Sequence, residues 1–154
     1  MINSRDYCLK LITIKDRTEK EIRNKLKEKN FDENIIEEEI EFLSNYGYIN
    51  DKRYAEHFTS DAINIKKWGK SRIRMELIRR GVDRDIVDDT IENAFSNADD
   101  DRLHTEMKKR FSDADFGNMK ERARIFNFYH RRGFSPDEIK GAMNRISAFR
   151  DIEE

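Results

Sequence analysis

Residues 66–80 combine residue types that bind anions, and they do so within one short segment. The segment holds seven basic residues and one acid, Glu76, which gives a local charge of +6. Four of the basic residues are arginines, whose planar guanidinium groups make paired hydrogen bonds to phosphates and carboxylates. Lysine would serve solubility equally well, so this composition favours a binding surface over a solvated helix face.

A second basic segment, residues 120–132, carries a local charge of +4. The two segments together predict a surface that binds a partner protein or a nucleic acid. The predicted binding residues are Lys66, Lys67, Lys70, Arg72, Arg74, Arg79, Arg80, Arg124, Arg131 and Arg132.

The net charge of the whole chain is −1, which by itself argues against a simple nucleic-acid binder. The charges are nevertheless segregated along the chain. Residues 30–41 hold six acids and no base, and residues 85–101 hold seven acids and no base. The nearly neutral total therefore hides basic and acidic surfaces.

The residue types needed for catalysis or metal binding do not cluster in the sequence. The histidines His57, His104 and His130 are isolated from one another, so no metal site is expected. Cys8 is the only cysteine, which excludes an intramolecular disulfide, and we expect it to be a buried, inert thiol. The chain has neither a glycine-rich phosphate loop nor a recognisable nucleophile motif. We therefore expect no enzyme activity, no metal and no cofactor.

No segment of the sequence has the character of a signal peptide or of a membrane span, which needs about 20 apolar residues. We expect a cytosolic, monomeric protein that does not contact a membrane.

The basic residues lie on elements that recur three times along the chain. The copies are EIRNKLKEKNFDENIIEEEI (21–40), RIRMELIRRGVDRDIVDDTI (72–91) and the weaker RIFNFYHRRGFSPDEIKGAM (124–143). Their apolar residues recur at helical spacing, and a chain that is 41 % charged and 36 % hydrophobic gives strands almost no support. We therefore predict an all-α fold.

Each copy is predicted to contain a helix, a tight turn that ends this helix, and a second, capped helix. We call the residue at the turn the stop. A stop with positive φ favours glycine or asparagine, and a short polar side chain caps the helix that follows. The predicted stops are Asn30, Gly81 and Gly133, and the predicted caps are Asp32, Asp83 and Ser135.

One more amphipathic segment precedes each copy, so each repeat should have three helices. These segments are Arg5–Thr13, Lys52–Ile65 and Arg102–Phe111. We predict three tandem three-helix repeats, with nine helices in all, over residues 1–50, 51–98 and 99–154. A unit of about 50 residues is only marginally stable alone. The repeats should therefore pack against one another in an elongated, curved stack that is either right- or left-handed.

The spacing also predicts where side chains point. Ile73 and Leu77 are four residues apart and should face the core, whereas Arg72 and Arg79 should face away from it. Trp68 either covers the start of its helix or faces a partner. The remaining aromatics at helical spacing are expected in the core rather than as base-stacking platforms, namely Tyr54, Phe58, Phe126, Phe128 and Tyr129.

Two blocks, GYINDKRYAEHF (47–58) and GKSRIRMELIRRGV (69–82), resemble the signature of the RecX family of bacterial recombinase regulators. The residues that match its pattern are Gly47, Tyr48, Asp51, Arg53, Tyr54, Ala55, Gly69, Arg72, Ile73, Glu76, Leu77 and Gly81. The resemblance extends through residues 18–43. It is faint in the third copy, where the glutamate of the pattern is absent and Tyr129 replaces its leucine.

This resemblance implies a non-enzymatic protein built from tandem three-helix units. It implies binding to the RecA recombinase filament on single-stranded DNA, weak binding to single-stranded DNA alone, and modulation, chiefly inhibition, of recombination and DNA repair. The arginines of residues 72–80 would then face the filament. Two alternatives stay open: a helix-turn-helix-like protein that acts on DNA directly, and a purely structural helical-repeat adaptor.

Overall fold

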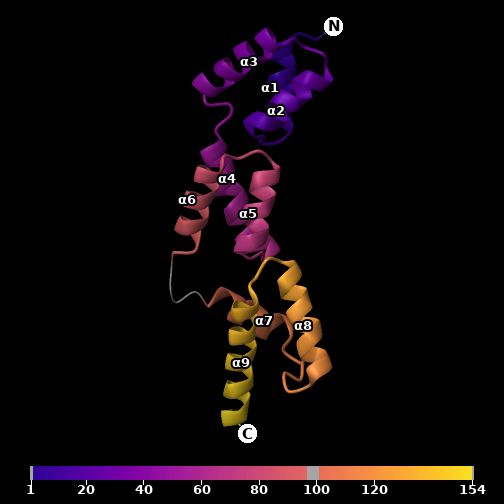
Figure 1. Ribbon diagram of the computed structural model, residues 1–154, viewed down its shortest axis with the longest axis vertical. Helices are drawn as coiled ribbons and strands as arrows, with labels where there is room; N and C mark the ends of the chain where they lie inside the picture. Colours follow the sequence, from indigo (N-terminus) through magenta and orange to yellow (C-terminus); the bar gives the residue numbers. More distant parts are fainter. Residues whose placement is uncertain (1, 97–100, 154) are drawn as a thin grey trace. The chain divides into compact units, whose positions relative to one another are not determined.

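The computed structural model describes residues 2–96 and 101–153 (Figure 1). Within these residues all regular structure is helical and there is no strand, which confirms the all-α prediction. The described elements are α1 (Ser4–Ile14), α2 (Glu19–Glu28), α3 (Glu33–Asn45), α4 (Asp51–Asp61), the π-helical turn η1 (Ala62–Lys66), α5 (Lys70–Arg79), α6 (Arg84–Ala94), α7 (Arg102–Arg110), α8 (Met119–Arg131) and α9 (Pro136–Glu153).

The chain divides into two compact units that do not coincide with the three predicted repeats. Unit 1 contains Met1–Thr59 and Glu76–Thr90, and unit 2 contains Ser60–Met75 and Ile91–Glu154. Helices α4, α5 and α6 contribute residues to both units. The repeat boundaries near residues 50 and 98 stay a prediction.

The core of unit 1 is built by α1, α2, α3 and the corner that follows them (Figure 1). Ile22 and Leu26 are four residues apart on α2 and have no exposed surface, as a helical stripe of apolar residues requires. The buried residues of this core are Cys8, Leu11, Ile22, Leu26, Ile36, Ile40, Leu43 and Ile49.

The core of unit 2 joins α7, α8 and α9, although the third copy matches the family pattern only faintly. Tyr129 replaces the leucine of the pattern and is completely buried, so a larger side chain fills the same helical position. The buried residues of this core are Met107, Ala114, Phe116, Ile125, Tyr129, Ile139, Ala142, Met143 and Ile146.

The three predicted stops are confirmed by their backbone angles. Asn30 has φ 64°, Gly81 has φ 91° and Gly133 has φ 94°. At each stop the chain leaves one helix and begins another, and the predicted caps bond as expected. Asp32 accepts a hydrogen bond from the Ile35 N–H at 3.0 Å, Asp83 accepts one from the Asp85 N–H at 3.3 Å, and Ser135 accepts one from the Glu138 N–H at 3.1 Å.

In unit 2 the backbone at the Gly133 stop is also hydrogen-bonded to the start of α5, which is distant in sequence. We call this backbone contact a joint. The Gly69 N–H donates to the Arg132 carbonyl at 2.7 Å, and the Ser71 N–H donates to the Gly133 carbonyl at 3.2 Å. A Cβ atom at Gly69 would lie 2.5 Å from the Gly133 carbonyl oxygen, and one at Gly133 would lie 2.4 Å from the Arg72 nitrogen. Glycine is therefore required on both sides because the two backbones approach so closely.

A corresponding joint is present in unit 1. The Thr18 hydroxyl, at the start of α2, donates to the Arg80 carbonyl at 2.7 Å, and Thr18 is completely buried. A Cβ atom at Gly81 would lie 2.3 Å from the Lys20 side chain. Thr18 and Gly69 occupy equivalent places in their copies, as do Arg80 and Arg132, so the same kind of joint occurs twice in the chain.

We predict that Gly133→Ala lowers the free energy of unfolding by about 1–3 kcal/mol, because it strains a positive φ and forces the joint apart. Gly141→Ala is the control, since Gly141 lies inside α9 and a Cβ atom there meets nothing within 4 Å. That change should raise stability by about 0.5–1 kcal/mol. Urea unfolding measures both, and a Gly133→Ala protein as stable as Gly141→Ala would contradict the role of the joint.

Cys8 should react only when unit 1 opens. It has no exposed surface, and burial, helped by the nearby Glu39 carboxylate, raises the pKa of its thiol to about 11. Because the thiolate is the reactive form, alkylation by iodoacetamide at mildly alkaline pH should be slow in buffer and fast in urea. Mass spectrometry measures the alkylated fraction, and rapid labelling of the folded protein would show that the thiol is accessible.

Candidate functional site

The joint in unit 2 brings together basic residues from segments about sixty residues apart in sequence. The hydrogen bonds of Gly69 and Ser71 hold the start of α5 against the end of α8, and Arg72 Nη1 donates to the Arg131 carbonyl at 3.3 Å. We call the basic residues of unit 2 that flank this joint in the sequence the basic cluster of unit 2: Lys66, Lys67, Lys70, Arg72, Arg74, Arg131 and Arg132.

Trp68 directly precedes Gly69 at the joint and is half-buried. The Arg72 guanidinium carbon is 4.1 Å from the centroid of its ring, and the Lys66 ammonium is 4.5 Å from it. Such cation–π contacts orient the two basic side chains. The two roles considered for Trp68, covering the helix start and facing a partner, stay predictions.

The members of the basic cluster of unit 2 differ in exposure. Lys66, Lys70, Arg74 and Arg131 are exposed, whereas Lys67 and Arg72 are partly buried. The Lys70 ammonium is 5.4 Å from the centroid of the Phe95 ring.

Arg132 has a structural role within the cluster. Its guanidinium carbon is 3.9 Å from the centroid of the Phe128 ring, and burial, followed by repulsion from Arg110, lowers the pKa of Arg132 below its ordinary value. Arg124, farther back on α8, is exposed, with its guanidinium carbon 5.7 Å from the centroid of the Phe111 ring.

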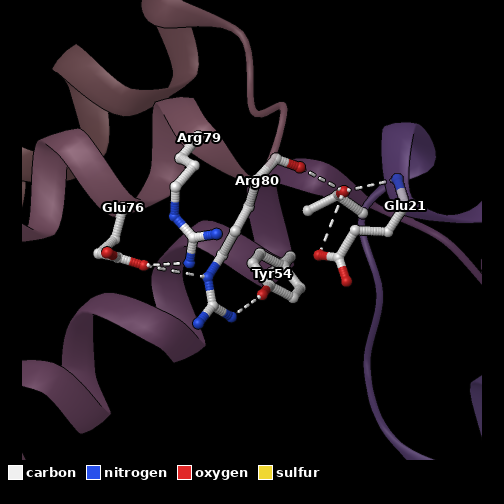
Figure 2. A network of polar contacts seen from close by, with 6 residues as sticks. Glu21, Tyr54, Glu76, Arg79 and Arg80 are labelled. Carbon is white, nitrogen blue, oxygen red and sulfur yellow. Dashed lines mark hydrogen bonds and ion pairs between the residues drawn. The ribbon is translucent and has the colours of Figure 1, made fainter. Parts of the chain in front are cut away.

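Arg79 and Arg80 belong to unit 1 and have different surroundings although they are adjacent (Figure 2). The Arg79 side chain is 67 % exposed and donates to the Glu76 carboxylate at 2.7 Å, which raises the pKa of Arg79. Arg80 lies inside a network: its Nη1 donates to the Tyr54 hydroxyl at 2.6 Å, and its guanidinium carbon is 4.5 Å from the centroid of the Phe58 ring.

This network links three separate parts of unit 1 (Figure 2). The Arg80 carbonyl accepts from Thr18, and Thr18 accepts from the Glu21 N–H at 3.2 Å at the start of α2. Burial raises the pKa of Tyr54, while the hydrogen bond from Arg80 opposes that shift. Arg80 therefore has internal partners, a role that its place in a basic run did not indicate.

The residues of the first sequence block hold the corner between α3 and α4. Gly47 has φ 74°, and Arg53 Nη2 donates to its carbonyl at 2.8 Å. Asp51 accepts from the Glu19 N–H at 3.0 Å, and burial raises the pKa of this carboxyl. Asp51 therefore begins α4 and also caps α2.

The predicted core residues of α5 are confirmed, since Ile73 and Leu77 have no exposed surface. Tyr54 and Tyr129 are also buried, and Phe58, Phe126 and Phe128 are partly buried, as expected of core aromatics. Arg79 faces solvent as predicted. Arg72 is partly buried, because its guanidinium group packs against the Trp68 ring.

The described residues contain no group of three His, Cys, Asp or Glu side chains arranged to hold a metal ion. A cavity of about 440 Å³ in unit 2 is lined by aromatic and charged side chains, among them Trp68, Phe95, Tyr129 and Lys67. Glu106 accepts a short hydrogen bond from the Tyr129 hydroxyl at its edge. Among residues 2–96 and 101–153, no helix combines the length and apolar character needed to span a bilayer.

We predict that Arg80→Ala lowers the free energy of unfolding by about 1–3 kcal/mol, because it leaves the Tyr54 hydroxyl without this donor and uncovers Phe58. Arg79→Ala is the matched control: it removes the same charge from the neighbouring position and should leave stability close to that of the wild type. Urea unfolding at one salt concentration compares them. Equal losses would mean that both arginines act only through their charge.

Sequence comparisons place this chain among known regulatory proteins. The family model described as "RecX, first three-helix domain" matches residues 5–43, and that of the second three-helix domain matches residues 50–91. "Regulatory protein RecX" of Clostridium perfringens is 31 % identical over 153 residues, which cover 95 % of this chain and 69 % of the relative. The protein of the same name from Thermotoga petrophila is 33 % identical over 141 residues, covering 92 % and 83 %.

Solved structures agree on the fold. The crystal structure of RecX from Lactobacillus salivarius has a TM-score of 0.77 and 24 % identity and covers 94 % of this chain and 95 % of its own. A second crystal structure, of a regulatory protein RecX, has a TM-score of 0.74 and 21 % identity and covers 92 % and 71 %. With two three-helix domains matched and relatives that are similar along almost its whole length, the chain belongs to the RecX family of regulatory proteins.

Proposed function

We propose that this chain regulates recombination without being an enzyme, by binding RecA recombinase and its filament on single-stranded DNA and restraining its activity. Family membership supports a regulatory role. The recombinase as partner follows from the resemblance of the two sequence blocks to recombinase regulators.

The observation that carries this proposal is the basic cluster of unit 2. The joint between Gly69 and Arg132 adds the end of α8 to the start of α5, so basic residues from two copies act together. Because the backbone joint fixes the two helix ends relative to each other, they need no rearrangement to meet an anionic surface together. The groove of a nucleoprotein filament offers phosphates and acidic side chains to such a cluster.

The charge distribution favours a coated filament over naked DNA. The net charge of the chain is −1, and α3 carries five glutamates and no base. High overall basicity would direct a protein to any DNA, whereas a local cluster on a nearly neutral chain needs additional protein contacts for tight binding. We therefore expect weak, salt-sensitive binding to single-stranded DNA and tight binding to recombinase-coated DNA.

Lys70→Glu combined with Arg131→Glu tests the cluster, because these exposed residues come from the two segments that the joint brings together. Glutamate at the first position of α5 also suits the helix dipole, so α5 should persist. Lys10→Glu combined with Lys140→Glu is the control, with the same charge change at exposed positions outside the two basic segments. Fluorescence anisotropy with labelled single-stranded DNA, bare or coated with RecA and a nucleotide, measures binding.

The cluster variant should bind coated DNA about tenfold to a hundredfold more weakly, while the control stays near wild type. Binding to bare DNA should fall with salt at a log–log slope of about −0.7 per phosphate contacted. Equal affinity of the wild type for bare and coated DNA would favour the helix-turn-helix alternative. Normal binding by the cluster variant would contradict the role given to these residues.

A further inference from the structure

The end of α3 and the corner after it expose a group of aromatic rings that the proposed function does not use. Tyr46 is 72 % exposed and Tyr48 is 46 % exposed. The partly buried Phe42 ring lies between them, with ring centroids 4.7 Å from that of Tyr46 and 6.2 Å from that of Tyr48. Tyr48 belongs to the family signature, yet its ring lies at the surface of unit 1.

Local structure holds these rings in place. Phe42 and Tyr46 are four residues apart and therefore lie on one side of α3. Gly47 then turns the chain with φ 74°, and the bond from Arg53 to its carbonyl fixes the corner, which returns Tyr48 to the Phe42 ring. The rings form a preorganised surface, so binding to it orders few additional groups.

Two exposed carboxylates lie on the same helix as Phe42 and Tyr46. Glu38 is four residues before Phe42 and therefore lies on the same side of α3, and Glu41 is one turn after Glu38. Of the other acids of α3, Glu37 is paired with Arg23 and Glu39 with Arg5. We call Glu38, Glu41, Phe42, Tyr46 and Tyr48 the aromatic–acidic surface.

Unit 1 already contains an example of what such a surface binds. The Arg5 guanidinium carbon is 3.7 Å from the centroid of the Phe42 ring, and Arg5 Nε donates to Glu39 at 3.2 Å. One arginine thus combines a ring face with a carboxylate. Tyr46 and Tyr48 offer further rings, and Glu38 and Glu41 offer further carboxylates, in the same neighbourhood.

We propose that the aromatic–acidic surface docks a basic polypeptide segment of a partner protein, with arginine side chains over the Tyr46 and Tyr48 rings and hydrogen-bonded to Glu38 and Glu41. Guanidinium groups suit both kinds of contact. Nucleic acid is disfavoured because the carboxylates repel phosphates. This docking surface lies in unit 1, is opposite in charge to the basic cluster of unit 2, and does not depend on the function proposed for that cluster.

A fluorescein-labelled peptide of alternating arginine and glycine is the probe, with a glutamate–glycine peptide as the charge control. Anisotropy measures its affinity for the full chain, and NMR amide shifts locate it. The wild type should bind the arginine peptide, with the largest shifts in residues 38–48. Tyr46→Ala with Tyr48→Ala should weaken binding about fivefold to tenfold, whereas Tyr46→Phe, which keeps the ring, should not.

A second pair of variants separates specific docking from general attraction. Glu38→Gln with Glu41→Gln should weaken binding by a similar factor, whereas Asp85→Asn with Asp89→Asn, which removes two exposed carboxylates from α6, should have little effect. Equal losses in the two pairs, or unchanged binding by Tyr46→Ala with Tyr48→Ala, would overturn the proposal. So would self-association in sedimentation that these tyrosine changes abolish, because a second copy would then be the occupant.

Discussion

The constraint on which the structure most depends is the close backbone contact between a helix stop and the start of a helix far away in sequence. In unit 2 the Gly69 N–H reaches the Arg132 carbonyl at 2.7 Å, and Gly69 and Gly133 leave no room for a Cβ atom. In unit 1 the Thr18 hydroxyl reaches the Arg80 carbonyl at the same distance. Unpaired polar groups at helix ends are costly when buried, so these joints satisfy them and position the neighbouring side chains at once.

This constraint explains why the arginines divide into two kinds. Arg80 and Arg132, the residues directly before the stops Gly81 and Gly133, extend their side chains over aromatic rings, at 4.5 Å from the Phe58 centroid and 3.9 Å from the Phe128 centroid. Arginine suits this place because its guanidinium group can cover a ring and still donate a hydrogen bond. Exposed basic residues one position away, Arg79 and Arg131, are free of the ring contact and can serve electrostatics instead.

The segregated charges belong to two different surfaces, which explains how a nearly neutral chain can bind charged partners. We propose that the basic cluster of unit 2 binds anionic partners and that the aromatic–acidic surface binds cationic ones. The two surfaces lie in different units. Each can therefore be tested by its own set of mutations, and both fit the binding roles proposed above.

Much of the fold was predictable from the sequence because its signals are local. Apolar spacing identified the buried positions Ile73 and Leu77, and glycine or asparagine followed by a capping residue marked the stops at Asn30, Gly81 and Gly133. The family was recognisable because the two sequence blocks contain stops and core residues, such as Gly47, Gly81 and Leu77, at fixed spacing. These features act within a few residues of one another, so spacing alone reveals them.

Only the tertiary structure decided which of two adjacent arginines is internal, because Arg79 and Arg80 have the same chemistry and differ only in what surrounds them. Thr18 caps α2, and its bond to the Arg80 carbonyl joins residues that helical periodicity does not relate. The same holds for the meeting of the α5 start with Arg131 and Arg132. The sequence by itself determined the helices, their ends and their apolar stripes. Tertiary packing alone determined the partners of the polar side chains, because those partners lie far away along the chain.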